Sequence, residues 1–97
     1  MATLVFAGRL AQDLARIEAH LRTHEVEDVE ARLAEIVQAL DLLARHPLIG
    51  RKVSQGRREL VIGQGSRGYV ARYGYDPVAE VVAVAALRSQ RESGFRG

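Results

Sequence analysis

Three consecutive stretches in the second half of the chain decide the fold: RRELVIG at 57–63, GYVARYGY at 68–75 and EVVAVAALR at 80–88. Each has the length of one β-strand, is rich in Val, Ile or Tyr, and is bounded by Gly, Asp or Pro. The connections are too short for a parallel crossover, so neighbouring strands are expected to be antiparallel. The third stretch is apolar on successive residues, which predicts a central strand buried on both faces.

The first half of the chain is expected to cover one face of this sheet. Apolar residues recur three or four positions apart over 9–23 and again over 26–45, a spacing typical of amphipathic helices. Asp13 and Arg16 fall mostly off the first apolar stripe. The second helix is expected to end at His46, because a residue before proline is disfavoured in the helical region.

A short strand at 3–7, the helical hairpin, a connector at 47–53 and the three later strands give an α+β layer fold. We expect the N-terminal strand and the antiparallel helical hairpin to pack on a small twisted antiparallel sheet. The length of 97 residues is that of a single domain, 1–97.

Composition and charge narrow the functional classes. Hydrophobic residues make up 47% of the chain and charged residues 27%, and there is no cysteine for a disulfide or a thiolate metal site. The apolar N-terminus is too short for a signal peptide or a membrane span, so a cytoplasmic protein is expected. Residues 1–50 carry a net charge of −3 and residues 51–97 carry +5. A basic sheet face suits nucleic acid or an acidic protein, or is simply solvated.

Two motif matches are better explained by structure than by ligands. GQGSRG at 63–68 matches G-x-G-x-x-G, but a strand follows it where a dinucleotide site needs a helix, so a hairpin loop is expected. His20 and His24 share a helix face without a third metal ligand in the pattern. No cofactor and no metal are therefore expected.

The arginines of the second half are the candidate functional set. In the strand 68–75, Arg72 alternates with Ala71 and Tyr73, so it points away from a tyrosine face packed under the helices. Arg58 and Arg88, at the ends of neighbouring strands, are expected to join it on the open face and to offer bidentate contacts to phosphates or carboxylates. The alternative is local pairing of these arginines with Glu59, Glu80 and Glu92, which would only keep the face soluble.

Five segments together carry a family resemblance: PLIGR at 47–51, RELVI at 58–62, GYVARY at 68–73, VAVAALR at 82–88 and QRESGF at 90–95. This ordered set resembles the RelE/ParE superfamily of toxins. The resemblance covers nearly the whole chain and implies a bacterial type II toxin–antitoxin module. In that superfamily RelE-like members cleave messenger RNA on the ribosome, whereas ParE-like members poison DNA gyrase and have no established catalysis.

Departures from the RelE pattern favour the ParE-like side. Glu59 and Val61 stand where the ribonucleases carry lysines, and Phe95 stands where they carry a C-terminal tyrosine. A phenylalanine cannot exchange a proton, and neither Glu59 nor Val61 stabilises the negative charge of a phosphorane. Arg88 alone matches and is the one candidate catalytic residue.

The resemblance also implies the partners. We expect a gyrase inhibitor that is not an enzyme, with the ribosome and messenger RNA, or a non-toxic antitoxin-binding module, as alternatives. The expected target-binding residues are Arg58, Arg72, Arg88, Arg91 and Phe95. A cognate ParD-like antitoxin, acidic and disordered when free, is expected to form a hetero-oligomer with the toxin by laying a helix in a groove. That groove is expected along Leu10, Leu14, Ile17, Leu33, Ile36 and Leu40.

Overall fold

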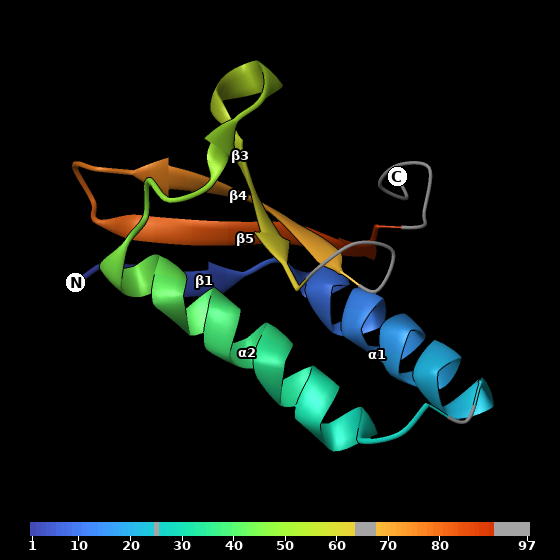
Figure 1. Cartoon of the computed structure of the whole chain (residues 1–97). Coiled ribbons are helices and arrows are strands. Elements are labelled where there is room, and N and C mark those ends of the chain that lie inside the picture. The colour runs from blue at the N-terminus through green and yellow to red at the C-terminus, as the bar shows by residue number, and fades with distance from the viewer. Residues whose placement is uncertain (25, 64–67, 91–97) are drawn as a thin grey trace.

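The computed structural model describes residues 1–24, 26–63 and 68–90. Along the chain lie, in this order, β1 (Thr3–Phe6), α1 (Gly8–Thr23), α2 (Val29–Arg45), β2 (Arg51–Lys52), the 3₁₀ turn η1 (Ser54–Gly56), β3 (Arg58–Ile62), β4 (Tyr69–Asp76) and β5 (Val81–Ser89). Both helices lie on the same face of the sheet (Figure 1). The result is the two-layer α+β architecture that the sequence predicts.

The five strands form one sheet in the order β1-β5-β4-β3-β2. The pairs β2–β3, β3–β4 and β4–β5 are antiparallel, as the short connections require. The expectation of a wholly antiparallel sheet is wrong at one edge, where β1 runs parallel to β5. These two strands come from opposite ends of the chain, so no connection length constrains their relative direction.

The strand β5 lies inside the sheet, between β1 and β4, but only part of it is buried on both faces. Val82 and Val84 are buried on the helix side, whereas Ala83 between them is exposed. Further along the strand, Ala86 on the face away from the helices and Leu87 on the helix side are both buried, so the predicted two-sided burial holds there and is wrong at Ala83. The central strand is β4.

The core lies between the sheet and the two helices. Alternate residues of the strands meet the apolar stripes of the helices there. The largest apolar or aromatic side chains that are fully buried there are Ile36, Leu43, Tyr73, Val82, Val84 and Leu87.

Helix ends follow local backbone chemistry. The helix α2 stops at Arg45 and His46 is its C-cap, as Pro47 predicts. It starts at Val29, later than the expected position 26, because Asp28 adopts a left-handed conformation with φ 56°.

Candidate target-binding face

The sheet has one covered face and one open face. Tyr69, Ala71 and Tyr73 of β4 are buried beneath the helices, and Arg72 points the other way, as the alternation predicts. The register opposes Arg72 to Glu59 on β3, and Glu59 to Arg51 on β2. Three neighbouring strands therefore bring Arg51, Glu59 and Arg72, the Glu59 cluster, into one row on the open face.

Glu59 holds both arginines of this cluster. Its Oε2 accepts a hydrogen bond from Nη2 of Arg72 at 3.1 Å, and its Oε1 lies 3.5 Å from Nη2 of Arg51. The Glu59 side chain is 7% exposed, while the side chains of Arg72 and Arg51 are 32% and 75% exposed. The open face therefore presents guanidinium groups whose countercharge is buried beneath them. Among the residues that the structure describes, Glu59 is an acidic partner of these arginines, as expected, and Glu92 lies outside the described residues.

Arg88 extends the open face along β5. Its strand neighbour Ala86 is paired with Arg72, and Arg88 itself is paired with Val70. On one face of an antiparallel sheet such diagonal neighbours are about 7–8 Å apart, within reach of long side chains. The guanidinium of Arg88 also donates to the carbonyl of Ser89 at 3.2 Å. Arg72 and Arg88 thus share the open face, and their role in target binding stays a prediction.

Arg58 does not join this face. It pairs with Tyr73 rather than with Arg72, and therefore points to the covered side of the sheet. Its Nη1 donates to the carbonyls of Leu48 at 3.1 Å and Gly50 at 2.7 Å. The expected convergence of Arg58 with Arg72 and Arg88 is wrong, because the register places successive residues of β3 on opposite faces. Arg58 ties the connector between α2 and β2 to the sheet.

The hydroxyl of Tyr73 binds the same connector. It donates to the carbonyl of Pro47 at 2.8 Å and accepts from the N–H of Gly50 at 2.9 Å. A Cβ atom on Gly50 would lie 2.7 Å from this hydroxyl and 2.8 Å from the carbonyl oxygen of Glu59, so only glycine fits there. Burial raises the pKa of Tyr73, although the hydrogen bond from Gly50 opposes the shift. Tyr73 is therefore a neutral structural anchor and is not placed to exchange protons at the open face.

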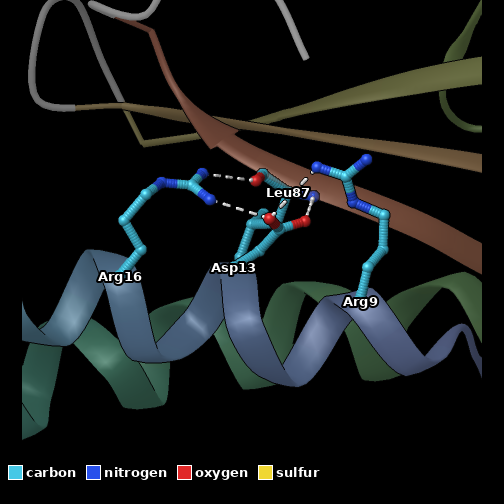
Figure 2. Close-up of polar contacts among 4 residues, drawn as sticks. All are labelled: Arg9, Asp13, Arg16 and Leu87. Carbon is cyan, nitrogen blue, oxygen red and sulfur yellow. Dashed lines mark hydrogen bonds and ion pairs between the residues drawn. The ribbon is translucent and has the colours of Figure 1, made fainter. Parts of the chain in front are cut away.

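A second buried carboxylate lies between α1 and β5 (Figure 2). Asp13 is 2% exposed, and its Oδ2 accepts the N–H of Leu87 at 3.0 Å. Its Oδ1 accepts from Nη1 of Arg16 at 2.8 Å and lies 3.5 Å from Nη2 of Arg9, while Nη2 of Arg16 donates to the carbonyl of Leu87 at 3.2 Å. Burial opposes ionisation of Asp13, but the hydrogen bonds from Leu87, Arg16 and Arg9 outweigh it and lower its pKa.

The position of β1 explains why Leu87 needs these partners. The last paired residue of β1, Phe6, lies opposite Val84, so β5 has no strand neighbour on that side beyond Val84. Asp13 and Arg16 supply the acceptor and the donor that a strand would supply. The expectation that Asp13 and Arg16 lie off the buried stripe is wrong for Asp13. The spacing itself indicates that Asp13 is buried, because Asp13 is three residues after Leu10 and four before Ile17 and so shares their helix face.

Most residues expected to form an antitoxin groove belong to the core. Leu10, Ile17, Ile36 and Leu40 are between 0% and 4% exposed, and Leu14 and Leu33 are partly buried against the same core. Buried side chains offer no surface to a second protein. The expectation that Leu10, Ile17, Ile36 and Leu40 line a surface groove is therefore wrong, because the sheet of this chain already covers their stripe. Arg91 and Phe95 lie outside the described residues.

The remaining ligand candidates are few. The rings of His20 and His24 lie 4.2 Å apart, and Nδ1 of His24 lies 2.9 Å from the carbonyl of His20. Within 1–24, 26–63 and 68–90, no three His, Asp or Glu side chains are grouped to hold a metal ion. In the same ranges no helix has the length and apolarity needed to cross a membrane.

Comparison with known proteins identifies the family of this chain. Residues 4–94 match a family described as ParE toxin of the type II toxin–antitoxin system, parDE. The chain belongs to this family of toxins. It is 30% identical over 83 residues to Toxin RelE3 of Caulobacter vibrioides, which covers 86% of this chain and 90% of that protein. Both names fall within the RelE/ParE superfamily of type II toxins.

Two solved structures share the fold. A chain of the chromosomal ParDE system from P. aeruginosa superposes with a TM-score of 0.73 at 18% identity, covering 92% of this toxin and 96% of that chain. A chain of the RelBE2 toxin–antitoxin complex from Mycobacterium tuberculosis gives a TM-score of 0.61 at 20% identity, covering 92% and 98%. At these identities the likeness concerns the fold alone.

Proposed function

We propose that this toxin inhibits DNA gyrase by binding it through the open sheet face. The observation that carries the proposal is the chemistry of that face. The Glu59 cluster and Arg88 offer hydrogen-bond donors, but the one carboxylate among them is buried and engaged by two arginines. Tyr73 is buried on the other face. Within the described residues the open face is therefore built for docking and lacks an acid–base pair for phosphodiester cleavage.

The proposal includes a cognate ParD-like antitoxin that holds the toxin inactive in a cytoplasmic hetero-oligomer. Membership of a toxin–antitoxin family and the two complexes among the structural relatives support this partner. Because the inner faces of α1 and α2 are occupied by the core, the antitoxin binds the exposed surface of the folded toxin. Light scattering of the co-expressed pair should therefore give the molar mass of a stable complex that contains both proteins.

A ribosome-dependent ribonuclease is the second candidate. The relative named Toxin RelE3 and the RelBE2 structure favour it, and Arg88 would be the cation that stabilises the transition-state charge. If the toxin cleaves messenger RNA, groups other than Glu59 and Tyr73 carry out the proton transfers.

Two parallel assays of the antitoxin-free toxin test the proposal. One follows supercoiling and DNA cleavage by gyrase, and the other follows messenger RNA cleavage on programmed ribosomes. We expect gyrase inhibition with intact RNA, weakened at least tenfold in Arg72→Ala and Arg88→Ala. Arg45→Ala removes an exposed arginine at the end of α2 and serves as the matched control. Ribosome-dependent cleavage without gyrase inhibition would replace the proposal by the second candidate.

A further inference from the structure

The Glu59 carboxylate has no obvious structural task. Asp13 and Glu59 are the buried charged residues of the described chain. Asp13 accepts a backbone N–H that has no strand partner, whereas the side-chain oxygens of Glu59 face Arg51 and Arg72. A buried ion pair is weak evidence for stability, because the desolvation of its charges offsets their attraction. The position of Glu59 among cations therefore calls for another explanation.

Charge on the open face is what Glu59 changes most. Arg51, Arg72 and Arg88 carry three positive charges, and Glu59 lowers the summed charge of these four residues to +2. Its position also matters, because a carboxylate 3.1 Å from one guanidinium and 3.5 Å from another occupies donors that a phosphate would use. Affinity for nucleic acid rises steeply with the number of cations free to neutralise phosphates.

We propose that Glu59 is a specificity-determining residue that keeps the open face from binding the phosphates of nucleic acid. It holds Arg72 in a fixed position while cancelling part of the field that would attract a polyanion. A protein partner is recognised by hydrogen-bond donors in fixed positions and by the shape of the surface. It does not need the large positive field on which binding of RNA or DNA depends. The inference rests on the proposed function in one respect, namely that the open face binds a protein rather than a nucleic acid.

Fluorescence anisotropy with a labelled 20-nucleotide single-stranded RNA tests this proposal. Glu59→Gln keeps the shape of the side chain and removes its charge. We expect it to bind the RNA about tenfold more tightly than the unmodified toxin at low salt, and the slope of log K against log[KCl] to steepen by about 0.7 for each phosphate newly neutralised. Glu27→Gln makes the same charge change at an exposed site between the helices and should leave the affinity within about twofold.

Two further variants separate charge from fold. Val61→Lys adds a cation on the open face two residues from Glu59, at a side chain that is half exposed, and leaves the buried pair intact. It should tighten RNA binding to a similar extent. Glu59→Gln combined with Arg51→Gln restores the net charge and should return the affinity toward that of the unmodified toxin. Circular dichroism confirms that each variant is folded.

The outcomes distinguish this inference from the gyrase proposal. Unchanged RNA affinity in both Glu59→Gln and Val61→Lys would overturn the role of Glu59. Equal tightening in Glu27→Gln would also overturn it, because the effect would then follow net charge alone. A toxin that fails to inhibit gyrase while Glu59→Gln gains RNA binding would overturn the gyrase proposal and support the role of Glu59 in excluding nucleic acid.

Discussion

The covered and the open face of the sheet each contain one buried carboxylate flanked by two arginines. On the covered side Asp13 binds a backbone N–H of β5 and completes the hydrogen bonding of a sheet edge. On the open side Glu59 binds the side chains of Arg51 and Arg72 and lies under the surface that a partner would meet. The two buried carboxylates therefore have different roles: Asp13 stabilises the fold, and Glu59 sets the charge of the surface that a partner would meet.

The difference lies in what would be left behind if each carboxylate were removed. Without Asp13, the N–H of Leu87 would be buried with no acceptor, which costs about 1–3 kcal/mol. Without Glu59, no backbone group loses a partner, and the side chains of Arg51 and Arg72 already have surface in contact with water, so the cost should be small. Stability measurements can therefore separate the two sites.

The largest effect is expected for Asp13→Ala. It orphans a buried donor and removes the countercharge of Arg9 and Arg16, so the free energy of unfolding should fall by about 3 kcal/mol. Urea denaturation followed by circular dichroism measures it. Asp41→Ala, an exposed acid on α2, is the control and should change stability by less than about 0.5 kcal/mol. A loss for Asp13→Ala no larger than for this control would contradict the structural role.

Tyr73→Phe should come second among the changes on the covered face. The variant keeps the aromatic ring and removes a hydroxyl that binds Pro47 and Gly50, leaving a buried N–H and a carbonyl without that partner. We expect a loss of about 2 kcal/mol in the free energy of unfolding. Hydrogen exchange should localise the change, with faster exchange at Gly50 than at residues of α1. Unaltered exchange at Gly50 would argue against the anchor.

Much of the covered face could be predicted from sequence, because alternation and helical periodicity report burial directly. The tyrosines of β4, the two apolar stripes and the end of α2 before Pro47 follow from these patterns. The parallel pairing of β1 could not be predicted, since it depends on how the layers close around the core. Asp13 was missed because a charged residue was assumed to lie outside a stripe whose spacing it in fact fits.

The open face was less predictable, because it depends on register between strands. Alternation within β4 correctly placed Arg72, but placing Arg58 required knowing that it pairs with Tyr73. A shift of one residue in the assumed pairing moves a side chain to the other face. The burial of Glu59 left no trace in the sequence, since it arises from the two arginines that the neighbouring strands bring over it.

The response to pH sharpens the comparison further. The pKa of Asp13 is lowered in the folded state, so its ionisation stabilises the fold above the unfolded pKa, near 4, and this contribution is lost as the pH falls through the folded value. Asp13→Asn removes the contribution. The stability difference between the unmodified toxin and Asp13→Asn, about 1–2 kcal/mol at pH 7, should therefore shrink as the pH is lowered toward 3. A difference that stays constant over this range would mean that another group carries the effect.

The smallest change in the free energy of unfolding is expected for Glu59→Gln. A small change would distinguish Glu59 from the structural carboxylate of Asp13. The amide oxygen of glutamine still accepts a hydrogen bond from Arg72, and Arg51, whose side chain is 75% exposed, remains solvated. The free energy of unfolding should change by less than about 1 kcal/mol, well below the loss for Asp13→Ala. Urea denaturation of both variants under the same conditions measures the contrast. If Glu59→Gln destabilised the toxin by about 3 kcal/mol, Glu59 would be a structural carboxylate like Asp13, and the two faces would differ only in what covers them. A small loss combined with a gain in RNA binding leaves the surface charge as the property that this residue controls.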